Sequence, residues 1–245
     1  MRHGGVRSQG TMTVAGVLLL AALSACGAGA GRGGGRAVAG AEGPGAASGR
    51  PARTGIPYVG DRLQRRIPAA SRQVVAVYGD GKDSAEATVV FYAKHGRVWD
   101  RVRGWPAHNG KKGWTLDHHA GDNRSPVGVF TLTAAGGVLD DPGTRLPYTQ
   151  SEDFAAPRWW DRSHWHDFDH VIAIDYNRVK GTPPDDPTQP EGADKGGGIW
   201  LHLDHGSGTS ACVSLSKPAM EYLLRTLDPD RHPVVVMGDR TALKA

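Results

Sequence analysis

Residues 198–215 read GIWLHLDHGSGTSACVSL, in which two short apolar runs flank a glycine-rich turn. The first run, residues 199–203, predicts a strand that delivers His202 near its end. Cys212 then opens a second short strand that leads into a helix. Two antiparallel strands joined by such a turn would bring a histidine and a cysteine ten residues apart into side-chain contact.

A histidine beside a cysteine is the pairing that thiol catalysis needs. The thiolate is the nucleophile, and a nearby imidazole can take the thiol proton to form a thiolate–imidazolium pair. The carbonyl of Leu203 can accept a hydrogen bond from the other ring nitrogen. The backbone N–H groups of Ser210, Ala211 and Cys212 would converge on a developing oxyanion. The spacing alone is a weak signal, and a small buried cysteine without reactivity is the alternative.

Working outward from this stretch, short β-branched and aromatic runs bounded by glycine and proline predict a mainly β domain. One helix is predicted after Ser216, because Met220, Leu223, Leu224 and Leu227 form a single apolar stripe. Residues 176–198 are rich in proline and glycine and predict a long loop. The class expected from these patterns is a sandwich or closed sheet with one or two short helices. The predicted strands are residues 73–78, 87–93, 97–105, 127–133, 171–176, 199–203 and 234–237.

The N-terminus has the pattern of a secretion signal. Two arginines precede about ten apolar residues, 13–22, which are too few to span a bilayer. The next residues, Leu23-Ser24-Ala25-Cys26, resemble a bacterial lipobox, which predicts that residues 1–25 are a lipoprotein signal peptide and that Cys26 is lipidated. The alternative is an ordinary secretory signal with an accidental cysteine. We therefore expect an extracytoplasmic protein, lipid-anchored to the outer face of the cytoplasmic membrane.

Residues 26–70 are dominated by Gly, Ala, Arg and Pro, without periodic apolar runs, so they predict a flexible tether ahead of a domain at residues 71–245. The first 70 residues hold nine of the 29 Lys and Arg but only two of the 25 Asp and Glu, which leaves 20 positive and 23 negative side chains for the domain. The basic character of the chain therefore belongs to its N-terminal part, and no nucleic-acid-binding domain is predicted.

The predicted domain contains one cysteine, Cys212. A secreted domain with a single thiol has no internal disulfide framework. An unpaired thiol in an oxidising compartment is either buried and inert or retained for chemistry.

These residues resemble the YkuD-type L,D-transpeptidase catalytic domain family. Its signature is a histidine late in a strand, a glycine-containing turn and Ser/Thr-x-Gly-Cys-Val/Ile, which stand here as His202, Gly206, Gly208 and Thr209-Ser210-Ala211-Cys212-Val213. A second stretch, Gly121-Asp122-Asn123-Arg124-Ser125-Pro126-Val127-Gly128-Val129-Phe130, is similar to the family's Gly-Asp-x-Arg-Thr/Ser-Pro-x-Gly-x-Phe segment. The resemblance covers roughly residues 72–240 and implies a YkuD-like β-sandwich of mixed sheets, with residues 71–245 as the catalytic domain.

Three positions depart from the family pattern. Ala211 replaces the usual glycine before the nucleophile and would cost about 1 kcal/mol if that position required a positive φ. Ser210 stands where histidine is frequent, and Ser214 stands where asparagine or arginine is frequent. These departures bear on rate and substrate preference more than on the identity of the nucleophile.

The resemblance implies a cysteine-dependent L,D-transpeptidase that acts on peptidoglycan stem peptides and needs no cofactor. Cys212 would attack the bond before the terminal D-Ala of a tetrapeptide stem, with His202 as base, and the resulting thioester would pass to an amine to give a 3–3 cross-link. Carbapenems would acylate the same thiol. The backbone of Ser210, Ala211 and Leu203 would assist. The expected substrate contacts are Gly208, Thr209, Ser214, Arg124 and Tyr176.

The alternatives are an L,D-carboxypeptidase on the same substrate, a peptidoglycan-binding lipoprotein that has lost catalysis, and a zinc amidase. We expect a monomer whose partners are peptidoglycan stems and, through its lipid, the membrane.

The histidine-rich segments raise the question of a metal site. His164-Trp165-His166, His118-His119 and His205 are available, but zinc requires three or four converging ligands. The tryptophan-rich context of the first segment favours a packed loop, so no metal is predicted. On a continuing strand His205 would face away from His202, which makes it a secondary candidate.

Two further features have competing interpretations. Trp159, Trp160 and Trp165 favour packing, with a wall of the substrate cleft as the alternative. Arg124 is either a contact for a stem carboxylate or a solvated charge.

Overall fold

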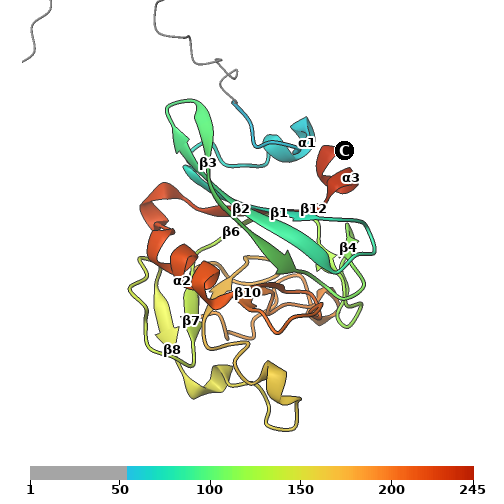
Figure 1. The fold of residues 1–245 in the computed structure, drawn as a ribbon, viewed down its shortest axis with the longest axis vertical. Coiled ribbons are helices and arrows are strands. Elements are labelled where there is room, and N and C mark those ends of the chain that lie inside the picture. The colour runs from blue at the N-terminus through green and yellow to red at the C-terminus, as the bar shows by residue number, and fades with distance from the viewer. Residues whose placement is uncertain (1–53) are drawn as a thin grey trace, which may run out of the picture. The chain divides into compact units, whose positions relative to one another are not determined.

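A computed structural model describes residues 54–245 (Figure 1). The predicted signal peptide, Cys26 and residues 26–53 of the predicted tether lie outside the described residues. Within them the strands are β1 (Gln73–Gly79), β2 (Glu86–His95), β3 (Val98–His108), β4 (Trp114–Thr115), β5 (Ser125–Pro126), β6 (Gly128–Thr131), β7 (Ala135–Gly137), β8 (Tyr148–Gln150), β9 (Val171–Ala173), β10 (Trp200–Leu203), β11 (Val213–Leu215) and β12 (Val234–Asp239). The helices are α1 (Asp61–Gln64), α2 (Lys217–Thr226) and α3 (Arg240–Lys244), and short 3₁₀ turns cover Glu152–Phe154, Arg162–His164, Ala193–Lys195 and Pro229–Arg231.

Ten strands form one mixed sheet in the order β6-β12-β1-β2-β3-β11-β10-β9-β7-β8, and β4 pairs with β5 separately. This mainly β architecture with few short helices is the class predicted from the sequence. The β9 strand ends at Ala173, earlier than the predicted residue 176, because the chain turns there into the long loop.

Strand β1, third in the sheet order, is buried along its whole length. It pairs in parallel with β12 and antiparallel with β2. Its sequence, QVVAVYG, is nearly continuous in apolar residues because both of its faces are covered.

Successive side chains of β1 enter two different apolar cores, as the two-residue period of a strand requires. Val75 and Val77 join the larger core, which includes α2 and the strands around β10. Val74, Ala76 and Tyr78 join a smaller core on the opposite face. Figure 1 shows α2 on one side of the β1–β3 strands, and α1 with α3 on the other.

Helix α2 begins after Ser216 as predicted and carries the predicted apolar stripe, whose last member, Leu227, caps its end. Proline occupies its first turn, and Ala219, Met220, Leu223 and Leu224 are fully buried. Burying each leucine contributes on the order of 1.5–3 kcal/mol. The helix packs against β10 and thereby fixes the strand that carries His202. No helix within residues 54–245 is long and apolar enough to cross a membrane.

The folded region begins earlier than predicted. Ile56 and Leu63 are buried in the smaller core, and the N–H of Gly60 donates to the carbonyl of Leu243 at 2.7 Å. The sequence predicts that residues 54–70 belong to the tether, and that boundary is wrong because Ile56 and Leu63 pack with Leu243 against one face of the sheet.

Candidate functional site

Strands β10 and β11 are parallel neighbours, with Leu201 opposite Val213 and His202 opposite Ser214. The antiparallel pairing predicted from the sequence is therefore wrong. Residues 204–212 carry the chain back to the start of the new strand, and on the way Thr209 forms a bridge with Gly110. Cys212 consequently lies near Trp200, whose backbone N–H donates to its Sγ at 3.4 Å.

A cleft of about 670 Å³ opens at this point. Three segments supply most of its lining: residues 160–168, residues 200–205 and residues 207–212. Both Cys212 and His202 line it. Cys212 is partly exposed and is a free thiol in the described part of the chain.

His202 is held in one tautomer. Its Nδ1 lies 2.8 Å from the carbonyl oxygen of Leu203, the contact that the sequence predicts. A carbonyl only accepts, so Nδ1 carries the proton and Nε2 keeps its lone pair. Burial lowers the pKa of His202 to about 4, so the ring is neutral at physiological pH and can accept a proton through Nε2.

The thiol of Cys212 has polar contacts of its own. It receives the N–H of Trp200 and lies 3.6 Å from the carbonyl oxygen of Gly198, whereas a hydrogen bond to His202 is not among its contacts with residues 54–245. The surrounding protein raises the pKa of Cys212 to about 11 by burial. The resting pair is therefore a neutral thiol and a neutral imidazole, not the ion pair expected from the sequence. An attack by this sulfur would therefore require the thiol proton to move at the same time.

The loop before Cys212 leaves backbone hydrogen-bond donors free. Neither the N–H of Ser210 nor that of Ala211 donates to another group among the described residues. The carbonyl of Cys212 accepts from the hydroxyl of Thr209 at 2.6 Å, and that of Ala211 accepts from Ser125 at 2.6 Å. These bonds fix the loop while its N–H groups remain available to an oxyanion.

Ala211 has an ordinary backbone conformation. It is not among the four non-glycine residues with positive φ in the described chain, Tyr58, Asn123, Asn177 and His232. The alanine at this position therefore carries none of the conformational cost considered above.

The match to a known family covers this whole arrangement. The family model of the YkuD L,D-transpeptidase catalytic domain matches residues 72–236, which include His202 and Cys212. This chain belongs to the YkuD family. No curated protein sequence matches it.

Two solved structures are similar to parts of this YkuD chain. Bd1075 of Bdellovibrio bacteriovorus is 15% identical with a TM-score of 0.38, and the match covers 68% of this chain and 48% of Bd1075. The helical cell shape determining protein Pgp2 of Campylobacter jejuni is 16% identical with a TM-score of 0.39, covering 67% of this chain and 46% of Pgp2. The chain thus spans about half the length of each.

The YkuD cleft includes only some of the predicted substrate contacts. Gly208 and Thr209 line it, as does Ser210. A Cβ on Gly208 would lie 2.6 Å from the Cα of Lys111, so glycine is required for this close approach.

Ser214, Arg124 and Tyr176 do not line the cleft, and each is bound within the scaffold. Arg124 contacts Asp83 at 2.7 Å, and the hydroxyl of Tyr176 donates to the carbonyl of Lys195 at 3.0 Å. The hydroxyl of Ser214 donates to Asp204 at 2.7 Å. Although burial opposes it, this bond and the contact with His108 lower the pKa of Asp204.

The structure places residues in the cleft that sequence reasoning ranked low. Strand β10 ends at Leu203, so His205 does not continue the strand. The rings of His205 and His202 lie nearly parallel, with their centroids 6.2 Å apart and an interplanar angle of 13°. His164 and Asp167 approach from the neighbouring loop. The three-residue spacing of His164 and Asp167 could have indicated that these two side chains meet. No local pattern in the sequence predicts that their loop lies against His205.

Proposed function

We propose that this YkuD domain is a cysteine-dependent L,D-transpeptidase that acts on peptidoglycan tetrapeptide stems. The observation that carries the proposal is the shared cleft in which a partly exposed free thiol and a neutral imidazole of fixed tautomer both lie. Family membership supplies the reaction class.

The proposed acylation uses groups of this chain in sequence. The thiol of Cys212 attacks the carbonyl carbon of the bond before the terminal D-Ala, and Nε2 of His202 takes the thiol proton. The free N–H groups of Ser210 and Ala211 support the oxyanion. Collapse of the tetrahedral intermediate breaks the C–N bond, the imidazolium returns its proton to the leaving amine, and D-Ala departs from the thioester.

The acceptor determines the product. The side-chain amine of a neighbouring stem gives a 3–3 cross-link, whereas water gives L,D-carboxypeptidase activity. The alternative is a wall-binding protein that has lost catalysis. The replacement of the usual glycine by Ala211 would favour this alternative if alanine strained the loop. The ordinary backbone of Ala211 removes that argument.

The test is acylation of the full chain by a carbapenem, followed by intact mass and by incubation with a disaccharide tetrapeptide. We expect one adduct per chain and release of D-Ala, with both lost in Cys212→Ala. The chain offers a matched control, since Cys26 is its other cysteine and Cys26→Ala should retain the adduct. An adduct that persists in Cys212→Ala, or D-Ala release by that variant, would refute the mechanism.

We also propose that the protein is a lipoprotein outside the cytoplasmic membrane, anchored through Cys26. The support is the lipobox-like Leu23-Ser24-Ala25-Cys26 after a short apolar run. Cells fed labelled palmitate should label the wild-type protein and not Cys26→Ala. Equal labelling of both would contradict the anchor while leaving the enzymatic proposal intact.

A further inference from the structure

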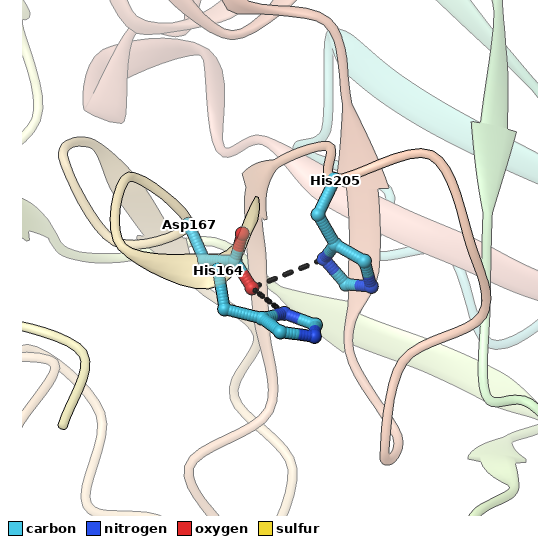
Figure 2. Close-up of side chains that lie close together, drawn as sticks. All are labelled: His164, Asp167 and His205. Atoms are coloured by element: carbon cyan, nitrogen blue, oxygen red, sulfur yellow. Dashed lines mark hydrogen bonds and ion pairs between the residues drawn. The ribbon is translucent and has the colours of Figure 1, made fainter. Parts of the chain in front are cut away.

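Beside the thiol, two imidazoles and one carboxylate converge from separate segments. Nδ1 of His164 lies 2.9 Å from Oδ2 of Asp167, and Nδ1 of His205 lies 3.0 Å from the same oxygen (Figure 2). One ligand atom from each of the three residues lies within 4.8 Å of the others. His164 ends the Arg162–His164 turn, Asp167 follows three residues later in the same loop, and His205 lies in the turn after β10.

His205 lacks the hydrogen bonds that its burial demands. Its side chain is only 4% exposed, and both of its ring nitrogens are buried without a hydrogen-bond partner. The approach of Nδ1 to Asp167 is close but is not aligned as a hydrogen bond. Leaving a buried polar group unsatisfied is costly, so an unpaired buried imidazole calls for a ligand.

The ligand types and spacing fit a transition-metal ion. Imidazole nitrogen and carboxylate oxygen are zinc ligands at about 2.0–2.2 Å, which places the ligand atoms of a tetrahedral site roughly 3.3 Å apart. The two nitrogen–oxygen separations of 2.9 and 3.0 Å are within a few tenths of an ångström of that value. A shift of a few tenths of an ångström in these separations would make room for a cation between the three residues.

We propose that His164, Asp167 and His205 bind a divalent transition-metal ion, Zn²⁺ foremost. All three residues line the cleft, so water or a group of a bound molecule would complete the coordination. The thiol of Cys212 is not part of this converging set. The ion would fasten the loop that carries Trp160 to the turn after β10. The last residue of that strand, Leu203, already donates its N–H to the carbonyl of Asp167 at 2.9 Å.

The metal itself is the probe for the test. The untagged full chain carrying Cys26→Ala is stripped with a chelator and titrated with zinc chloride by calorimetry, with metal content measured after dialysis. We expect one equivalent of Zn²⁺ and a higher Tm with the ion than without it, since an ion that binds only the folded state stabilises it. Failure of this protein to bind one equivalent would overturn the proposal.

Three variants locate the site. His164→Ala removes a partly exposed ligand, and His205→Ala removes the buried one; each should weaken Zn²⁺ binding by about a hundredfold or more. His166→Ala is the matched control, because that histidine lies on the same loop, is 80% exposed and pairs with Asp169 instead. It should bind Zn²⁺ as the parent does. Equal binding by the parent and His164→Ala would place the ion elsewhere and overturn the proposal.

A fourth variant separates this site from the nucleophile. Cys212→Ala should still bind one Zn²⁺ although it loses the carbapenem adduct, so the metal proposal and the proposed function can fail independently. Loss of Zn²⁺ binding in Cys212→Ala would show that the ion sits on the sulfur and would refute the three-residue site.

Discussion

The two walls of the cleft are built differently. On one side, β10 and β11 are anchored by side chains such as Leu201, Val213 and Leu215, all fully buried. On the other side, the segment around residues 157–168 has no strand, and its Trp159 and Trp160 are 84% and 41% exposed. One wall is fixed by the core, whereas the other depends on a few polar and aromatic contacts.

The two proposed reacting residues, His202 and Cys212, both belong to the wall that the core fixes, here called the rigid wall. The bond from Nδ1 to the carbonyl of Leu203 fixes the tautomer of His202. The opposite wall, here called the loop wall, contacts His202 through Phe168; the two rings meet edge-on, with their centroids 5.3 Å apart. Substitutions on the rigid wall should therefore change catalysis or folding, while those on the loop wall should change binding.

The largest effect is expected at His202. His202→Ala removes the proposed proton acceptor, and we expect kcat/KM for D-Ala release to fall by about 10²–10⁴-fold, the usual contribution of a general base. Steady-state kinetics on a disaccharide tetrapeptide measure it. His202→Gln, which fills more of the same buried space, should fall by a similar factor and shows that the loss is chemical. Activity within about threefold of wild type in both would mean that another group takes the proton.

The next effect concerns stability. Leu223→Ala cuts a fully buried side chain from the α2 stripe and should lower the free energy of unfolding by about 2–5 kcal/mol. Urea denaturation measures it. Leu116→Ala offers a control, because that leucine is 69% exposed and should change stability by less than about 0.5 kcal/mol. Similar losses in the two variants would contradict the assigned core.

The sequence predicted the rigid wall better than the loop wall for a physical reason. Strand β10 and helix α2 have local apolar patterns that are set by the core, so His202, its bond to Leu203 and the stripe of α2 could be anticipated. The parallel pairing of β10 with β11 could not, because β11 has only three residues and its direction is set by its other partner, β3, about a hundred residues earlier in the chain. His205 was misplaced for a related reason, since its orientation depends on a strand end that no local signal marks.

The ionisation of the Cys212 thiol tests how strongly the folded cleft affects this side chain. Burial raises the pKa of Cys212 to about 11, from an ordinary value near 9, so the thiolate is scarcer in the folded protein at every pH below the raised value. At pH 8 we expect iodoacetamide to alkylate the folded Cys26→Ala protein about a hundredfold more slowly than the same protein in urea, because the thiolate fraction is about a hundredfold lower when the pKa is about 11 than when it is near 9. The folded rate should rise with pH through 9 and 10 toward 11. A folded rate that levels off below pH 8 would show a pre-formed thiolate.

The smallest effect on the fold is expected at the loop wall. Trp160 packs edge-on against Phe168 at 6.3 Å and lines the cleft, but much of its ring is in solvent. Trp160→Ala should therefore change the free energy of unfolding by no more than about 1 kcal/mol. If the indole contacts bound stem or glycan, KM should rise several-fold with kcat within about twofold, because uniform binding is lost without a change in the transition state. Steady-state kinetics separate the two constants. A kcat that falls as steeply as in His202→Ala would mean that this wall orients the reacting groups, and the division between a catalytic wall and a binding wall would be wrong.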